Sequence, residues 1–244
     1  MALPLRPALL PALLLACAPL QAAVPWLAGG HLKSRALAAS YPDESILRDS
    51  AGAMAYDGGA GLRLRFSESR GEFTLQADYQ LLAQVGDSIQ LVEDTQGLLP
   101  LAPVLPDDDR RWFDLTRTIS EGGSRRLVHR LDRLHVGYAG EKVVLRFGRQ
   151  AVSWGNGLIY TPMDFFNPFD PAAVDTEYKV GDDMLYAQYL LDSGNDWQFV
   201  SVQRRDADGD VTSGVSSTAL KFHGFGVEQE YDLLLAEHFD QLIL

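Results

Sequence analysis

The amino-acid sequence predicts an all-β protein, an antiparallel up-and-down transmembrane β-barrel with about eight or nine strands in this chain. Three observations lead to this prediction. Apolar and polar residues alternate in repeated segments, and short connections between these segments alternate with long ones. In addition, no stretch after the N-terminal segment approaches about 18 consecutive apolar residues, which excludes an α-helical membrane protein.

The clearest alternation runs from residue 73 to residue 85, FTLQADYQLLAQV. Every second residue is apolar or aromatic, and most of the residues between them are polar. This run is long for a soluble strand, and an apolar outward face with a polar inward face suits a membrane barrel with a wet lumen. Residues 62–66 alternate in the same way and, with a turn at 69–71, complete a predicted hairpin.

The same pattern predicts nine strands along the chain, at about 31–40, 62–69, 73–85, 128–139, 142–150, 184–192, 197–204, 217–223 and 227–236. Turns within the hairpins are short, whereas other connections are long. Outer-membrane barrels have short periplasmic turns and long external loops. The segments 86–127 and 151–183 are therefore predicted to be extracellular loops.

Nine strands leave the chain ending on an upward strand, whereas single-chain bacterial barrels normally have an even number. The last residues, Gln241–Leu244, also lack a terminal aromatic side chain. We therefore expect a barrel truncated at the C-terminus, or one whose remaining strands come from another reading frame or subunit.

The first 23 residues have the features of a signal peptide, and the barrel domain is predicted to cover 24–244. Arg6 gives a positive start, 7–17 is apolar, and Ala22 and Ala23 offer a cleavage site. A second interpretation makes Cys17, which follows Leu-Leu-Ala, an acylated lipoprotein residue. Because Cys17 is the one cysteine, the mature chain has no disulfide.

The formal net charge of −12 argues against a nucleic-acid partner. The predicted partners are those of an exported barrel: outer-membrane lipid and lipopolysaccharide, the barrel-assembly machinery and an unknown small solute. The predicted location is the outer membrane. No cofactor is expected.

Residues 148–171, GRQAVSWGNGLIYTPMDFFNPFDP, form a loop rich in glycine, proline and aromatic residues. Loops of this length are usually functional or disordered, and the aromatic residues argue against disorder. The candidate pore-constriction residues are Arg149, Trp154, Tyr160, Asp164, Phe166, Asn167 and Asp170. Two interpretations remain open: the loop lines a constriction, or its aromatic residues pack it into a plug or onto the rim.

The alternation also places charged residues on the inward face. The candidate lumen charges are Arg63, Arg65, Asp78 and Arg146. Such charges either filter ions or neutralise one another across a narrow lumen.

Several residues of this loop carry a family resemblance: Gly148-Arg149-Gln150, Ser153-Trp154-Gly155, Asp164 and the run 167–171, NPFDP. They resemble the loop of uncharacterised proteobacterial porin-like outer-membrane β-barrel proteins, loosely those of alginate-export type. The resemblance implies a complete, larger barrel with a loop folded into its lumen. It also implies a channel or exporter, without revealing the solute.

Other motifs favour no catalytic function. Asp206, Asp208 and Asp210 have the opening spacing of a calcium loop, but Val211 and Ser217 stand where such a loop needs glycine and glutamate, so they are a weak metal candidate. The protein is not expected to be an enzyme, because no hydrolase or phosphate-binding motif is present. The alternatives are a plugged structural or assembly barrel, a soluble periplasmic β-protein and an outer-membrane hydrolase.

Overall fold

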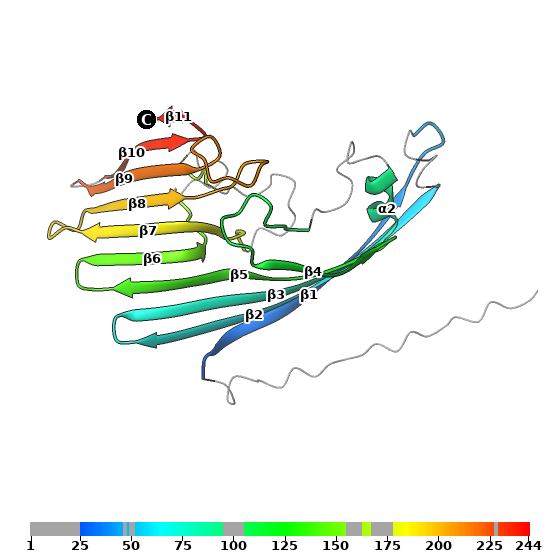
Figure 1. The fold of residues 1–244 in the computed structure, drawn as a ribbon, viewed down its shortest axis with the longest axis horizontal. Coiled ribbons are helices and arrows are strands. Elements are labelled where there is room, and N and C mark those ends of the chain that lie inside the picture. The colour runs from blue at the N-terminus through cyan, green and yellow to red at the C-terminus, as the bar shows by residue number, and fades with distance from the viewer. Residues whose placement is uncertain are drawn as a thin grey trace, which may run out of the picture.

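The computed structural model describes residues 25–45, 48, 52–94, 105–154, 163–166, 178–226 and 229–244. These residues form an all-β structure with one short helix (Figure 1). The elements are β1 (Leu27–Ser40), β2 (Met54–Arg70), β3 (Phe73–Gly86), α2 (Asp87–Asp94), β4 (Thr116–Gly122), β5 (Arg125–Ala139), β6 (Val143–Gln150), β7 (Asp182–Leu190), β8 (Asp196–Val202), β9 (Ser217–Phe225), β10 (Glu230–His238) and β11 (Gln241–Ile243).

All eleven strands belong to one antiparallel sheet. Its order is β1-β2-β3-β5-β6-β7-β8-β9-β10-β11, and β4 pairs with β5 beside this path. Each strand on the path pairs with the next one along it in the antiparallel direction. The up-and-down topology predicted from the alternation is therefore confirmed.

The nine predicted strands are all present, but two corrections are needed. The prediction missed β4, which lies inside the predicted loop 86–127, and β11, which follows a turn at Phe239 and Asp240. The strand β2 also begins at Met54, well before the predicted residue 62. The prediction missed its first half because that glycine-rich stretch lacks alternation. With β11 included, the path has an even number of strands, so its first and last strands run in opposite directions.

The connections sort to the two ends of the strands as predicted. In Figure 1 the short turns of the hairpins β2–β3, β5–β6, β7–β8 and β9–β10 lie together at one end, and the long connections lie at the other. Gly71, in the turn between β2 and β3, has a φ of 59°, a left-handed conformation that glycine adopts without steric cost.

The two faces of the sheet differ in chemistry. One face, which we call the outer face, carries large apolar side chains that are exposed, including Leu75, Val136, Leu145, Phe147, Leu185, Tyr189, Trp197, Leu220, Leu233 and Leu235. The opposite face, which we call the inner face, carries buried charged side chains such as Arg63, Asp78 and Arg130. This polarity is the reverse of that in a water-soluble sheet.

The hydrophobic core lies on the inner face of the second half of the sheet. Met184 and Tyr186 of β7 and Val200 and Val202 of β8 are buried there. The long connection after β6 contributes Val152, Trp154 and Phe166 to the same cluster. The core therefore joins the sheet to the loop that the sequence singled out.

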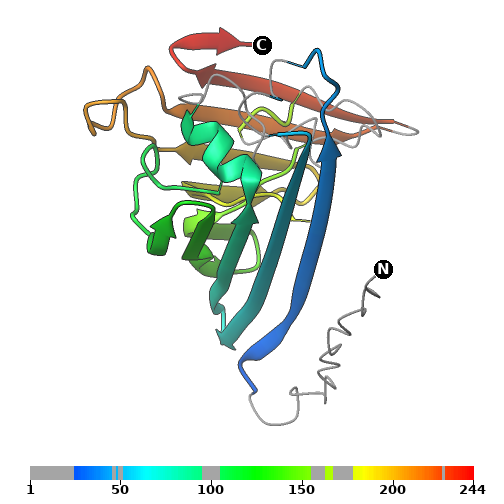
Figure 2. The same ribbon diagram turned by 90° about the vertical axis from the view of Figure 1, so that its right-hand side faces the viewer.

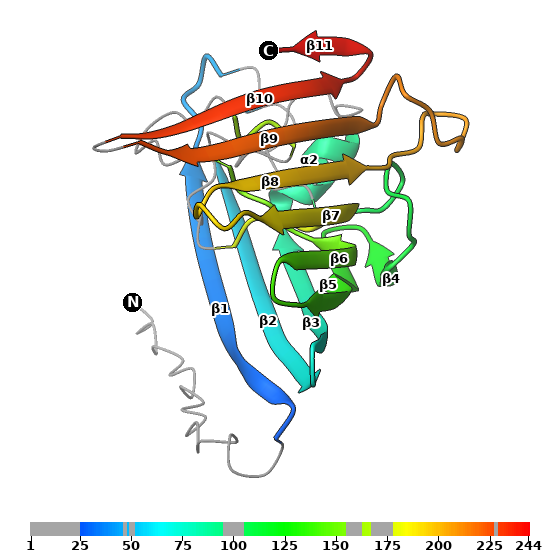
Figure 3. The ribbon, with the colours of Figure 1, turned by 90° about the vertical axis from the view of Figure 1, so that its left-hand side faces the viewer.

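The sheet curls but does not close. In Figures 2 and 3 the strands β1–β3 run steeply, whereas β9–β11 run across them at the other edge. The strands β1 and β11 are the two edges, and no pairing joins them among the described residues. The predicted closed barrel is therefore not formed by this part of the chain. Within the same part, no helix is long and apolar enough to cross a membrane.

The core position of Met184 predicts a stability effect. Met184→Ala is expected to lower the free energy of unfolding by about 2–5 kcal/mol, since it leaves a cavity in a packed site. Leu185→Ala, at the next position on the exposed outer face, is the matched control and should cost well below this range. Urea unfolding of the refolded protein in detergent measures both, and equal losses would contradict the assignment of the faces.

Candidate functional site

The described part of the loop between β6 and β7 packs onto the inner face. Trp154 and Phe166 are each 3% exposed, and their rings meet edge to face at 5.2 Å between centroids. The indole Nε1 of Trp154 donates a hydrogen bond of 2.7 Å to Oε1 of Gln198, a residue of β8. Two of the predicted constriction residues are thus fixed against the sheet.

Charged side chains hold both limbs of this loop. The ammonium group of Lys179 donates hydrogen bonds to the carbonyl oxygen of Val152, at 2.8 Å, and to the carboxylate of Asp164. Arg204 donates from Nη2 to the carbonyl oxygen of Phe166, at 2.6 Å. Asp164 therefore serves as a partner for a buried lysine.

The returning limb of the loop is attached to a bulge in β5. The pairing of β3 with β5 shifts register beside Asp78, so that Asp132 and Arg133 both lie near the inner face. Arg133 donates to the carbonyl oxygen of Lys179, and the backbone N–H of Gly181 donates to Oδ1 of Asp132 at 3.3 Å. A Cβ on Gly181 would lie 2.2 Å from the carbonyl oxygen of Asp132, so only glycine fits there.

Tyr178, which precedes Lys179, contacts residues of the strands β1 and β2. The guanidinium carbon of Arg63 lies 4.5 Å from the centre of the Tyr178 ring, and the ring of His31 stacks on it at 5.2 Å. His31 and Arg63 belong to β1 and β2, whereas Lys179 contacts residues that follow β6. The loop thus spans the inner face from one part of the sheet to another.

A buried ion-pair network lies under this loop. Arg63 contacts Asp78 at 3.2 Å and Asp132 at 3.0 Å, and Arg133 contacts Asp132 at 2.7 Å. Alternation in the sequence correctly placed Arg63 and Asp78 on one face. It missed Asp132 and Arg133, because a bulge changes which residues face inward and leaves no mark in a period-two pattern.

The other two lumen-charge candidates also lie on the inner face, and Arg65 stands directly opposite Asp78 in the pairing of β2 with β3. The guanidinium carbon of Arg146 lies 4.2 Å from the centre of the Tyr186 ring, a cation–π contact. The guanidinium of Arg65 lies against Gly29, where an added Cβ would be 3.1 Å from Nη2.

Arg149 lies on the outer face, and this corrects its expected position in a constriction. Arg149 shares its side of β6 with the exposed Leu145 and Phe147, yet it is fully buried. Its guanidinium bonds Asp183 at 2.8 Å from Nε and Asp108 at 2.8 Å from Nη1. It also donates to the carbonyl oxygen of Phe113, at 2.6 Å.

The segment 105–115 covers this part of the outer face. Trp112 and Phe113 stack on each other at 5.1 Å, and both rings meet the edge of Phe147 at 6.0 Å. The strand β4 continues this segment along the first half of β5, opposite the side that pairs with β3. The segment therefore shields Arg149 from the surroundings of the outer face.

Asp108 is the residue of the segment 105–115 whose carboxylate bonds Arg149. Burial alone would raise the pKa of its carboxyl, but the hydrogen bonds and positive charge of Arg149 outweigh burial and hold the pKa below its usual value. The backbone N–H of Leu115 adds a further bond of 2.6 Å to the carboxylate. The ion pair thus ties the covering segment to the sheet.

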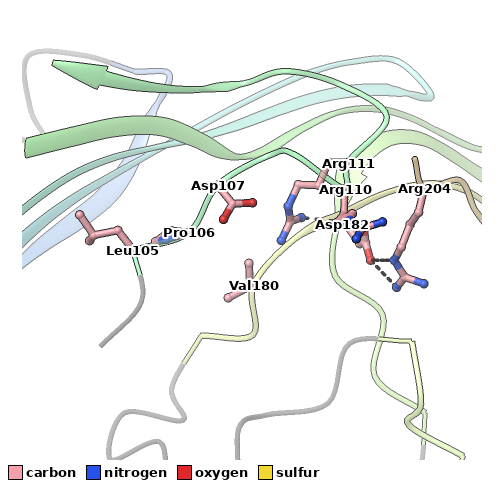
Figure 4. Close-up of a pocket in the computed structure, with 8 residues that line it drawn as sticks. All are labelled: Leu105, Pro106, Asp107, Arg110, Arg111, Val180, Asp182 and Arg204. Carbon is pink, nitrogen blue, oxygen red and sulfur yellow. Dashed lines mark hydrogen bonds and ion pairs between the residues drawn. The ribbon is translucent and has the colours of Figure 1, made fainter. Parts of the chain in front are cut away.

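A hollow of about 360 Å³ opens beside this cluster (Figure 4). Arg204 contacts Asp182 there at 2.6 Å, and Arg111 lies 3.9 Å from the same carboxylate. The lining residues are Leu105, Pro106, Asp107, Arg110, Arg111, Val180, Asp182 and Arg204. The hollow is a recess with both charged and apolar walls at the long-connection end of the sheet.

The remaining candidates divide into two groups. Tyr160, Asn167 and Asp170 lie outside the described residues. The carboxylate of Asp206 accepts backbone hydrogen bonds from Asp208 and Asp210, each at 3.0 Å, which explains the acidic spacing as a turn. Among the described residues, no three histidine, cysteine, aspartate or glutamate side chains form a group that could hold a metal ion.

Comparison with known proteins finds no match for this chain. No protein-family model matches the chain, and neither a curated protein nor a solved structure is similar to it. The fold therefore defines the class by itself: an antiparallel up-and-down sheet with an exposed apolar face, a charged inner face and a loop packed against that inner face.

The lowered pKa of Asp108 predicts a pH dependence. A carboxyl whose pKa is lower in the folded protein stabilises the fold above its unfolded value of about 3.9, and this contribution is lost as the pH falls through the folded pKa. Asp108→Asn should therefore lower the unfolding free energy at pH 7, with a difference from the natural protein that shrinks below about pH 4. Urea unfolding between pH 2 and 8 measures this, and a constant difference would contradict it.

Proposed function

We propose that the chain is an outer-membrane β-barrel protein, a porin-like channel or transport component in which the loop 148–171 forms the constriction. The observation that carries this proposal is the polarity of the sheet. Apolar side chains are exposed along one face, while charged side chains are buried on the other. A sheet face with exposed apolar side chains is expected where the protein contacts lipid rather than water.

The opposite directions of the two edge strands support the same proposal. Unpaired backbone groups are too costly in hydrocarbon, so a membrane sheet closes upon itself. The first and last strands of the path run in opposite directions, as an up-and-down barrel requires where it closes. We propose that both edges are paired when the barrel is complete.

The position of the loop supports a constriction. Trp154, Phe166 and Tyr178 contact inner-face residues, which in a barrel line the lumen. The second candidate function, a non-transporting structural or assembly barrel, is favoured by the same contacts if the loop fills the lumen. The ion pair between Lys179 and Asp164, which holds the loop, gives a way to distinguish the two.

The proposed lipid contact predicts a difference between neighbouring positions of β3. Leu75→Arg, on the outer face, should destabilise the protein folded in lipid vesicles by up to about 2–4 kcal/mol, since it places a cation against hydrocarbon. Gln76→Arg, on the inner face, is the matched control and should have a smaller effect. Urea unfolding from the vesicles measures both, and equal effects would argue against a membrane location.

Release of the loop predicts a change in conductance. Lys179→Met removes the charge that bonds Val152 and Asp164, and the loosened loop should give a larger single-channel conductance in planar bilayers. Lys142→Met, which removes an exposed lysine paired with Asp192 at the short-turn end, is the matched control and should leave conductance unchanged.

The outcomes separate the candidate functions. Stepwise openings of the natural protein, enlarged in Lys179→Met, support the channel. Openings in Lys179→Met alone support the plugged structural barrel. Folded, heat-modifiable protein that gives no openings in either form rejects the channel, and fractionation away from the outer membrane supports a soluble periplasmic protein instead.

A further inference from the structure

The strand β4 has one edge without a partner strand. It pairs with β5 on one side, and within the described part of the chain no strand pairs with its other side. The backbone N–H of Leu131 donates to the carbonyl oxygen of Leu115 at 3.0 Å, so the backbone groups of Leu115 and Arg117 point toward β5. Those of Thr116 and Thr118, at the alternate positions, therefore point toward the free edge.

The backbone at this edge is accessible. Arg117 and Thr118 are exposed. The carbonyl oxygen of Thr116 accepts a bond of 3.2 Å from Nη1 of Arg117, an exposed side chain that an incoming strand can displace. Unpaired backbone groups on an edge strand form a template for a further strand. A register shift between Thr118 and Ser120 limits the regular part of this edge to its first residues.

A recess of about 880 Å³ lies along the same edge. Thr116, Arg117 and Thr118 line it on the side of β4, whereas Arg205 and Ala207 line it from the connection after β8. The residues whose backbone groups point to the free edge therefore border open space. A further extended strand has room beside the groups with which it would pair.

The walls of this recess are acidic. Its charged residues are five carboxylates and three arginines, namely Asp107, Asp108, Asp109, Asp114, Glu121, Arg117, Arg126 and Arg205. Asp107 accepts a backbone hydrogen bond of 3.2 Å from Asp109, and neither carboxylate forms an ion pair with a cation of the described residues. The recess thus offers negative charge to a cationic partner.

We propose that the free edge of β4 binds an extended, positively charged peptide segment of another protein by β-strand addition. Main-chain hydrogen bonds to Thr116 and Thr118 supply affinity, and basic side chains of the peptide that meet Asp107 and Asp109 supply specificity. The site does not depend on a pore, because it is built from β4 and the residues 105–109 that precede it.

A capped, fluorescently labelled hexapeptide of alternating lysine and threonine is the probe, because it combines positive charge with a preference for extended structure. Fluorescence anisotropy with the refolded full chain in an uncharged detergent measures its binding. A peptide with glutamate in place of lysine should bind at least about tenfold more weakly, since like charges then meet in the recess. A peptide of alternating lysine and proline keeps the charge but lacks half of the main-chain donors, so it should bind about tenfold more weakly as well.

The backbone of the protein gives a second measurement. Thr118→Pro removes a donor at the free edge without removing a bond to β5, and it should weaken binding of the lysine–threonine peptide about tenfold. Thr118→Val keeps the N–H group and is the matched control, which should bind as the natural protein does. The comparison of the peptides decides the question even if Thr118→Pro does not fold, because it needs no variant.

The acidic wall gives a third measurement. The double variant Asp107→Asn and Asp109→Asn should weaken binding about fivefold at low salt. Asp192→Asn removes an exposed carboxylate at the short-turn end and should leave binding unchanged. Equal binding of the lysine–threonine and lysine–proline peptides shows attraction to the net charge of −12 alone and overturns the proposal. Absence of binding by the lysine–threonine peptide overturns it too, whether or not the protein conducts ions.

Discussion

The structure depends on one constraint, the pairing of buried charges on a sheet whose apolar side chains are exposed. Arginines and aspartates that face the inside lose their water, and each must find a partner of opposite charge. Arg63 does so across two strands, with Asp78 on β3 and Asp132 on β5. These contacts fix how neighbouring strands are registered and how the loop is held against them.

The loop after β6 depends on the same charges. The bulge at Asp132 turns two successive residues of β5 toward the loop, and Asp132 and Arg133 bind its returning backbone at Lys179 and Gly181. Ring contacts then complete the attachment, with Trp154 and Phe166 packed on the core. The described residues of this loop are therefore held by both polar and apolar contacts.

Alternation in the sequence predicted most of the strands and both faces of the sheet. It also placed Arg63 and Asp78 on the same face, because every second residue of a strand faces one side and each of them alternates with apolar neighbours on its own strand. It missed β4, whose polar residues do not alternate, and β11, which is only three residues long. Alternation puts Arg149 on the side of Leu145 and Phe147, so the expectation that it lines a constriction was wrong. A covering segment from elsewhere in the chain makes that part of the outer face a buried polar site, which no local pattern records.

What the sequence by itself determined is the period-two pattern, and with it the all-β class, the order of the hairpins and the sorting of short and long connections. These features are local, since each is set by residues close together in the chain. Only the tertiary structure decided which charges meet. Arg149 and Asp108 are 41 residues apart and Arg63 and Asp132 are 69 apart, and such contacts follow from strand pairing, a bulge and a covering segment that no local pattern records.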